Sequence, residues 1–164
     1  MHPCKKVDLD FFDSAPMTFT NTVSISLAPE ELFDFLARAD TWSRWAKVIT
    51  DVEYTSPEPR GVGTTRVVTM RGGIVGDEEF LAWEPGVHLA FRFNSSSTST
   101  LVAFLEDYRI VPTETGCDLT WSLAQETKGA SKFLSPVTRP LTNMMFKHFL
   151  KNLQKVTAAP ASTW

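Results

Sequence analysis

The chain has 164 residues, of which 43% are hydrophobic and 21% are charged, so its composition is that of one globular domain and excludes disordered, collagen-like and coiled-coil chains. The formal net charge of −3 argues against a nucleic-acid partner, since proteins that bind nucleic acids usually carry a basic excess. The chain is rich in rings, with 12 Phe and 5 Trp residues. That many aromatic side chains indicate a large core or a cavity lined with them.

The two ends of the chain lack a periodic apolar face. Residues 1–16 are charged and hold no apolar stretch typical of a secretory signal, and no run approaches the roughly 18 apolar residues that a membrane span requires. These features predict a cytoplasmic protein without an integral membrane segment. We expect residues 1–16 and 157–164 to be loosely held on either side of a domain that spans residues 17–156.

Cysteine and histidine are sparse. Cys4 and Cys117 are far apart, and His2, His88 and His148 are scattered, so neither set has the spacing of metal ligands. The two thiols are predicted to be free, with a disulfide between them as the alternative. We expect no metal and no cofactor.

The first elements show two different periods. Residues 17–27 alternate between apolar and mostly hydroxyl-bearing side chains, which predicts a half-buried antiparallel strand. A helix is expected to begin at Pro29 and to end near residue 40, because proline suits the first helical position and two acids follow it. Trp42 and Trp45 predict a second short helix that docks through its rings.

Six further strands follow. Apolar or β-branched runs alternate with turns that hold Gly, Pro, Asn or Ser, and connections this short force neighbouring strands to be antiparallel. The predicted strands are residues 48–54, 64–70, 74–83, 88–94, 101–111 and 117–124.

A helical period returns over residues 131–156. Pro136 and Pro140 predict a break or kink in its first part and a regular helix from Leu141 onward. The side expected to face the sheet holds Val137, Leu141, Met144, Met145, His148 and Asn152, and a second apolar edge holds Phe146, Leu150 and Leu153.

A seven-stranded antiparallel sheet curled around this long C-terminal helix, with two short helices after the first strand, gives every apolar face a partner. The predicted class is therefore α+β. One helix cannot fill the concave side of such a sheet, so a small-molecule pocket between the two is the expected site.

Several stretches resemble one family in their order and spacing. Residues 25–36, followed by Asp40 and Trp45, resemble the opening of the START-like (SRPBCC) superfamily in its polyketide cyclase/dehydrase and lipid transport branch. Later stretches resemble that branch's strand signatures: residues 61–64, 84–85, 88–91 and 116–121. The resemblance runs over residues 17–156. It implies a helix-grip fold whose hydrophobic cavity binds lipids, sterols, polyketides, plant hormones or quinones, or in some members catalyses aromatic cyclisation or dehydration.

The candidate ligand-binding residues are those expected to face this cavity. They are Arg66, Met70, Phe91, Phe93, Phe104, Trp121, Leu141, Met145, His148 and Asn152. For each ring and methionine, ordinary core packing is the alternative. For His148 there are two alternatives. Either it titrates near neutrality and hydrogen-bonds a ligand, or its ring nitrogens form hydrogen bonds with a strand or a buried water. Arg66 enters the cavity if its strand face points inward and is otherwise solvated.

Asp77, Glu78 and Glu79 fall on both faces of one predicted strand. At least one of them therefore points inward, unless the run is a solvated or bulged edge.

Two functions stay open. The favoured one is binding of a hydrophobic or amphipathic small molecule, lipid-, polyketide- or quinone-like, with no catalysis required, because no acid/base pair is apparent. The alternative is a polyketide aromatase/cyclase or dehydrase, in which His148 and an inward Arg or acid would transfer protons and stabilise an enolate. The partner is then the small molecule, and the chain is a monomer or a homodimer.

Overall fold

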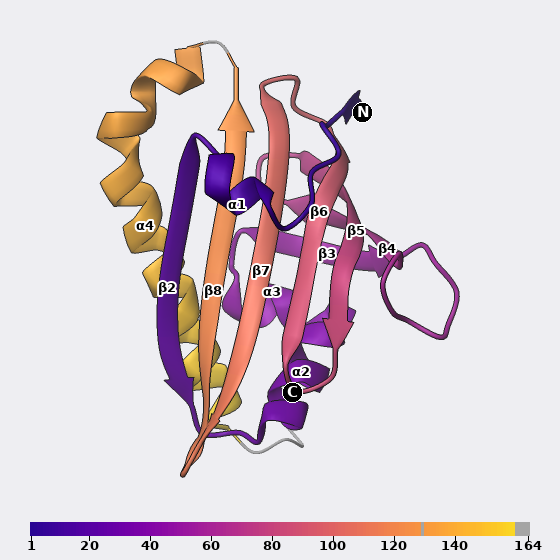
Figure 1. Cartoon of the computed structure of the whole chain (residues 1–164), viewed down its shortest axis with the longest axis vertical. Coiled ribbons are helices and arrows are strands. Elements are labelled where there is room, and N and C mark those ends of the chain that lie inside the picture. The colour runs from indigo at the N-terminus through magenta and orange to yellow at the C-terminus, as the bar shows by residue number, and fades with distance from the viewer. Residues whose placement is uncertain (129, 160–164) are drawn as a thin grey trace.

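The computed structural model describes residues 1–128 and 139–159 in full and, for residues 130–138, only the course of the backbone. One antiparallel sheet curls around a long helix (Figure 1). The elements, in chain order, are β1 (His2–Pro3), α1 (Phe11–Ser14), β2 (Met17–Ile25), α2 (Pro29–Ala37), a 3-10 turn (Ala39–Thr41), α3 (Trp42–Trp45), β3 (Ile49–Tyr54), β4 (Thr65–Met70), β5 (Ile74–Glu84), β6 (His88–Ser96), β7 (Leu101–Thr113), β8 (Gly116–Thr127) and α4 (Ala130–Thr157).

The strands run in the order β2-β8-β7-β6-β5-β4-β3, so each strand from β3 to β8 pairs with its neighbour in sequence and β2 closes the far edge beside β8. All of these pairs are antiparallel. The predicted seven-stranded sheet and α+β class are confirmed, and β1 adds a short eighth strand by pairing with β6.

The two short helices that follow β2, α2 and α3, dock against the concave face of the sheet. Pro29 occupies the first turn of α2, and Glu31 accepts a hydrogen bond from the Ala28 backbone N–H at 3.1 Å, which stabilises the helix start. In α3, Trp42 and Trp45 are almost completely buried, and the indole N–H of Trp42 donates to the Leu36 carbonyl at 2.9 Å. The predicted docking of this turn through its rings is therefore confirmed.

α4 lies along the sheet and is continuous from Ala130 to Thr157, so of the break or kink predicted at its prolines the break does not occur. Its buried side holds Phe149, Leu150 and Leu153, which recur at the 3.6-residue period. Leu141 and Met144, at 65% and 61% exposure, lie on the opposite side. The prediction of which apolar edge faces the sheet is thus wrong; the second edge is the buried one, and Val137 lies outside the residues whose side chains are described.

The charges of α4 are all of one sign. Its sequence contains five of the 16 Lys and Arg residues of the chain and none of the 19 Asp and Glu residues. Arg139, Lys147, Lys151 and Lys155 are exposed on it. All acidic side chains, and 11 basic ones, therefore belong to the rest of the molecule.

Residues 1–16, predicted to be loosely held, pack across the outer face of the sheet (Figure 1). Val7 and Phe11 are buried there in a second cluster with Ala103, Leu105 and Ala124. The Arg92 guanidinium fastens the segment by donating to the Val7 carbonyl at 3.1 Å and by pairing with Asp8 and Glu79. Of the tail expected from residue 157, Thr157 is buried in α4, and residues 160–164 lie outside the described chain.

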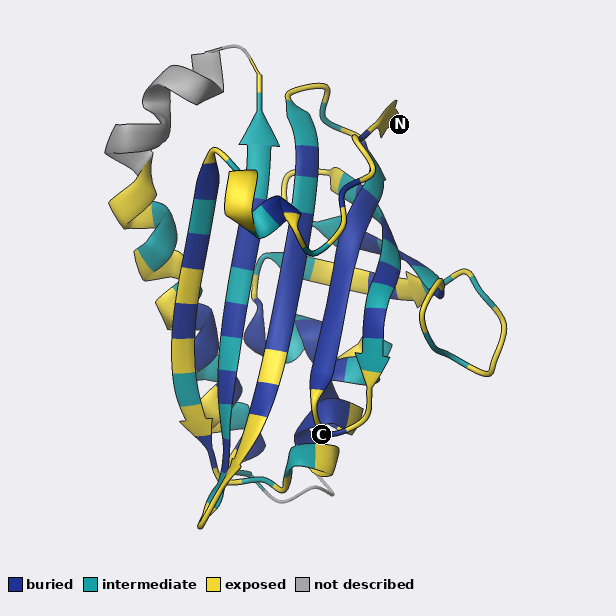
Figure 2. Cartoon of the chain, in the orientation of Figure 1, coloured by how far each residue is buried: buried dark blue, intermediate teal, exposed yellow. Residues whose placement is uncertain are grey.

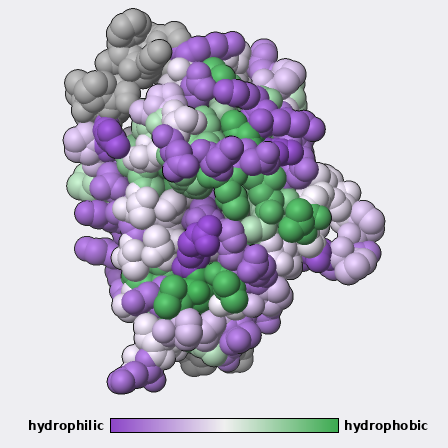
Figure 3. All heavy atoms as spheres, viewed as in Figure 1, coloured by the Kyte–Doolittle hydropathy of each residue, from purple (hydrophilic) through white to green (hydrophobic). Residues whose placement is uncertain are grey.

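This cover explains why β6 is buried along most of its length on both faces (Figure 2). Figure 3 shows the same outer face in space-filling form, where hydrophobic residues lie in separate patches bordered by hydrophilic ones.

Candidate functional site

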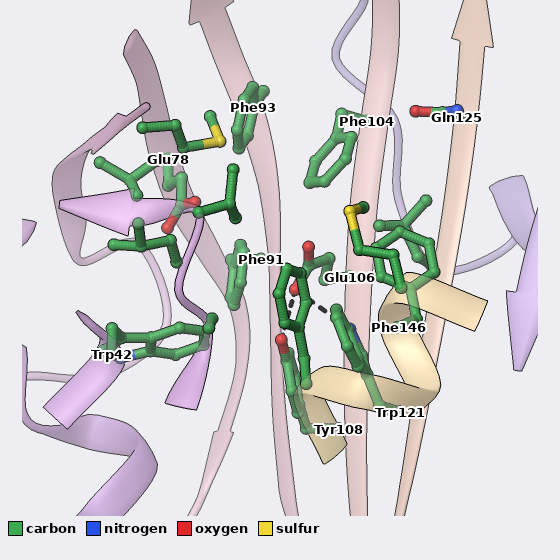
Figure 4. Close-up of a pocket in the computed structure, with 18 of the residues that line it drawn as sticks. Trp42, Glu78, Phe91, Phe93, Phe104, Glu106, Tyr108, Trp121, Gln125 and Phe146 are labelled. Atoms are coloured by element: carbon green, nitrogen blue, oxygen red, sulfur yellow. Dashed lines mark hydrogen bonds between the residues drawn. The ribbon is translucent and has the colours of Figure 1, made fainter. Parts of the chain in front are cut away.

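A cavity of about 240 Å³, partly open to solvent, lies between the concave face of the sheet and the helices α3 and α4. Aromatic and aliphatic side chains form most of its wall, and two carboxyl groups lie among them. Ten of the lining residues are labelled in Figure 4: Trp42, Glu78, Phe91, Phe93, Phe104, Glu106, Tyr108, Trp121, Gln125 and Phe146. An apolar cavity of about 150 Å³ holds benzene. The volume therefore suits a molecule of one ring or two fused rings.

Alternation along the central strands places these rings in rows across the cavity floor. Tyr108 in β7 lies opposite Trp121 in β8, and the two rings stack with centroids 5.7 Å apart. On its other side, Tyr108 stacks on Phe91 of β6 with centroids 5.9 Å apart. The α4 side closes this row, since the ring of Phe146 meets that of Trp121 edge-on at 4.8 Å.

Glu106 is the polar centre of the floor. It lies two residues before Tyr108 on the same face of β7, and the Tyr108 hydroxyl donates to its Oε2 atom. The indole Nε1–H of Trp121 donates to the same oxygen at 3.1 Å. One carboxyl oxygen thus accepts two hydrogen bonds from aromatic side chains, and Figure 4 shows the other pointing away from both donors toward the space below Phe104.

Burial controls the charge of Glu106. Removal from water and, to a smaller extent, the negative charge of Glu78 raise the pKa of its carboxyl, while the two hydrogen bonds and Arg66 lower it, and the net result is a pKa of about 8 against an ordinary value of 4.5. Burial and the adjacent Glu106 also raise the pKa of the Tyr108 hydroxyl well above its usual value of 10. At neutral pH both groups therefore carry their protons.

The second carboxyl, Glu78, is held by a buried cation. Arg66 lies opposite it on β4, and the Nε atom of Arg66 donates to Glu78 Oε2. The guanidinium carbon lies 4.4 Å from the ring centroid of Trp42 and 4.5 Å from that of Phe91. Burial raises the pKa of Glu78, and the neighbouring Arg66 offsets part of that rise. Of the two orientations left open for Arg66 and for the acids of residues 77–79, the structure has the inward one for Arg66 and Glu78.

Six of the predicted site residues line the cavity: Met70, Phe91, Phe93, Phe104, Trp121 and Met145. Arg66 does not line the cavity itself; it lies behind Glu78, which does, and donates a hydrogen bond to it. Asn152 lies half-buried beside α3, where its amide donates to the Trp45 carbonyl at 3.4 Å.

Leu141 and His148 are exposed and do not line the cavity. Their predicted inward orientation is wrong because it followed from placing α4 with the wrong edge toward the sheet. The ring of Phe146 occupies the space next to Trp121 instead.

Sequence reasoning missed Glu106 and Tyr108, which form the centre of the site. Their signal is present in the predicted strand 101–111, where Phe104, Glu106 and Tyr108 share one parity, so that an acid alternates with rings on the inward face. It also missed the buried pair of His88 and Asp107, which lies on the opposite face of the sheet from the cavity.

Within the described residues, no three His, Cys, Asp or Glu side chains are grouped as a metal site would require. Cys4 and Cys117 are both buried free thiols. No helix in the described part of the chain is long and apolar enough to cross a bilayer.

The antiparallel sheet wrapped around α4, with a ring-lined cavity between them, defines a START-like helix-grip protein. The family comparison agrees, because a model described as polyketide cyclase/dehydrase and lipid transport matches residues 16–158. The chain belongs to this family. It is 52% identical over 159 residues to proteins of Mycobacterium tuberculosis and Mycobacterium bovis, both named uncharacterized, and the match spans 97% of this chain and 95% of each relative.

Solved structures share the fold at low sequence identity. A START superfamily protein from Mycobacterium smegmatis matches with a TM-score of 0.72 and 13% identity over 86% of this chain and 97% of its own. A protein from Thermus thermophilus matches with a TM-score of 0.71 and 15% identity over 88% and 99%. Ginseng major latex-like protein 151 from Panax ginseng gives 0.65 and 10% over 87% and 98%. At these identities the likeness concerns the fold alone.

Proposed function

We propose that the protein binds one small, largely apolar, ring-containing molecule in the cavity between the sheet and α4. The observation that carries this proposal is the cavity itself: about 240 Å³ bordered by stacked and edge-on rings, in a chain whose family description includes lipid transport. Aromatic walls favour flat ligands, because stacked and edge-to-face ring pairs contribute about 0.5–1.5 kcal/mol each beyond area burial. Met70 and Met145 supply flexible side chains that adapt to the ligand's outline.

The first experiment is native mass spectrometry of the purified protein, followed by extraction and identification of any retained molecule. A stoichiometric small molecule with one or two rings supports the proposal. A protein that is recovered empty is then titrated with naphthalene and followed by tryptophan fluorescence, since Trp42, Trp45 and Trp121 line the cavity. Absence of saturable binding in that titration contradicts the proposal.

Two adjacent methionines provide a matched pair of variants. Met145 lines the cavity although it is 42% exposed, whereas Met144 is 61% exposed and does not line it. Met145→Trp should fill part of the cavity and weaken naphthalene binding at least tenfold. Met144→Trp adds the same ring one position away in the same helix and should bind as the unmodified protein does. Equal binding by both variants would place the ligand elsewhere.

A second candidate function is proton-transfer catalysis of the cyclase or dehydrase type, and the protonated Glu106 favours it. A carboxyl group with a pKa of about 8 holds a proton at neutral pH and can deliver it to a carbonyl oxygen, while the carboxylate of Glu78 in the same cavity would accept the proton from the adjacent carbon. In this version Glu106 takes the role that His148 was expected to have. Incubation with 1-tetralone in D₂O tests it, because catalysed enolisation exchanges the α-protons for deuterium, and Glu106→Gln should abolish the acceleration.

A further inference from the structure

We propose that Glu106 is an uncharged hydrogen-bond donor that selects ligands carrying a neutral acceptor oxygen, such as a ketone carbonyl on a ring system. The inference rests on the proposed binding function and names the ligand class of the same cavity. It follows from where the donors and acceptors of the cavity floor lie.

The position of the acidic proton is fixed by the two aromatic donors. A carboxyl oxygen has two acceptor sites, and both sites on Glu106 Oε2 are taken, one by the Tyr108 hydroxyl and one by the Trp121 indole N–H at 3.1 Å. The proton of the neutral acid therefore belongs on Oε1. That oxygen points away from both donors into the space bordered by Phe104 (Figure 4).

The surroundings keep Glu106 neutral. Besides Tyr108, the ionisable groups that act on it are Glu78 and Arg66, which already form an ion pair with each other. α4 presents the uncharged residues Thr142, Met145, Phe146 and Phe149 to the cavity. No cation contacts the carboxyl among the described residues, and burial raises its pKa to about 8, so about nine molecules in ten hold the proton at pH 7.

This arrangement discriminates among ligand head groups by charge. A cationic amine would lose its hydration in a cavity where Glu106 is uncharged and the carboxylate of Glu78 is already paired with Arg66. An anionic carboxylate would approach the negative charge of Glu78, which lines the same cavity, and would lose its own hydration. A neutral carbonyl accepts the Glu106 O–H bond with neither penalty, and its ring system occupies the space between Phe104, Trp121 and Phe146.

A pair of bicyclic compounds isolates this hydrogen bond. Tetralin and 1-tetralone differ by one carbonyl oxygen and have nearly the same size. Dissociation constants are measured for both by isothermal calorimetry at pH 6.0 and pH 9.5, which lie on either side of the Glu106 pKa of about 8. After correction for the partition of each compound between water and octanol, we expect 1-tetralone to bind about five- to tenfold more tightly than tetralin at pH 6.0. The preference should vanish at pH 9.5, because an ionised Glu106 has no proton to donate.

Two variants separate the donor from the shape of the side chain. Glu106→Gln keeps the carbonyl that accepts from Tyr108 and Trp121 and presents an N–H₂ donor to the cavity, so the preference for 1-tetralone should persist and no longer change with pH. Glu106→Leu removes the donor and should bind both compounds equally. If Glu106→Leu does not fold, the proposal is tested by the unmodified protein and Glu106→Gln: the preference for 1-tetralone should fall with rising pH in the first and stay constant in the second.

The outcomes distinguish the two proposals. Equal corrected binding of tetralin and 1-tetralone by the unmodified protein at pH 6.0 would overturn the role of Glu106 and leave the binding function intact. A preference for 1-tetralone that survives in Glu106→Leu would assign the donor to another group and also overturn it. Failure of both compounds to bind would overturn the binding function and this inference together.

Discussion

Arg66 and Glu78 lie directly opposite each other on β4 and β5 and form an ion pair that is almost completely buried, with side-chain exposures of 1% and 4%. Of the two, Glu78 is the member that reaches the wall of the cavity, which is lined mostly by rings and alkyl chains. Its cation is shielded from water by the faces of Trp42, Phe80 and Phe91. Such a pair is sensitive to the loss of either member, because the survivor is left as an uncompensated buried charge.

Arg66→Met should therefore lower the free energy of unfolding by about 3–5 kcal/mol at pH 7. The double variant Arg66→Met/Glu78→Leu should recover most of this loss, since both charges are then absent. Urea unfolding followed by tryptophan fluorescence measures both. Arg109→Met is the control: Arg109 pairs with Asp107 but is 57% exposed, so its loss should change stability by less than about 1 kcal/mol. A double variant no more stable than Arg66→Met would refute the argument.

Glu106 should make the protein less stable as the pH rises. The neutral carboxyl is favoured in the folded state, with a pKa of about 8 against 4.5 in the unfolded chain, so the folded state binds the extra proton between these values. The contribution is complete below pH 4.5 and is lost as the pH rises to 8, with a slope of up to about 1.4 kcal/mol per pH unit. Unfolding free energies of the protein and of Glu106→Gln, measured from pH 5 to pH 9, should differ by this slope. Parallel profiles would mean that Glu106 is ionised in the folded protein.

Gly76 and Phe93 are packed so closely that Gly76 sets the position of a cavity ring. A Cβ atom at Gly76 would lie 2.4 Å from the Cε2 atom of Phe93. Gly76→Ala must therefore push the Phe93 ring inward, and overpacking of this kind destabilises by about 1–3 kcal/mol. The same variant should weaken naphthalene binding by narrowing the cavity.

The control for Gly76 is Gly61→Ala, where the added methyl group meets no atom within 4 Å. That variant should leave both stability and binding nearly unchanged. Normal naphthalene affinity in Gly76→Ala would show that the Phe93 ring can move without affecting the cavity.

The N-terminal segment should contribute to global stability. Phe11 is only 6% exposed and packs in the cluster on the outer face of the sheet, so Phe11→Ala is expected to lower the unfolding free energy by about 3–5 kcal/mol. Differential scanning calorimetry measures the change. The neighbouring Phe12, which is less buried, provides the comparison, with a smaller loss for Phe12→Ala. An unchanged transition temperature in Phe11→Ala would show that the segment is loosely held, as predicted from the sequence.

Strands were the easiest elements to predict, because turn residues mark both ends of most of them. In β8, Cys117, Leu119, Trp121 and Leu123 alternate with polar residues and are all buried, so period and position agree. α4 carries two apolar edges instead of one, and periodicity alone does not show which of them faces the sheet. Tertiary contacts determine which edge is buried: the ring of Phe146 packs edge-on against those of Phe19 and Trp121, with centroids 5.3 and 4.8 Å apart. These contacts cannot be predicted from the local sequence pattern.

The aromatic side chains of the site could be predicted from the sequence, but the roles of its carboxyl groups could not. Phe91, Phe93 and Trp121 follow from strand parity. The roles of Glu106 and Glu78 depend on partners that lie on other strands, since each carboxyl takes its donors from across the sheet or from an inward side chain two residues away. The anchoring of residues 1–16 depends in the same way on partners distant in sequence, among them the Arg92 guanidinium and the cluster with Ala103 and Leu105.

Because the charges of α4 are all positive and the acidic side chains lie elsewhere, the molecule has an overall electric dipole moment. Four of its exposed cations lie on the helix that covers the cavity, while every acidic side chain belongs to the sheet, the short helices and the loops. A chain with a net charge of −3 therefore does not behave as a uniform anion. An anionic matrix should retain it through α4 at low ionic strength, in one orientation, and release it as the Debye length shrinks to about 8 Å near physiological salt. In that orientation the cavity lies directly behind the bound surface.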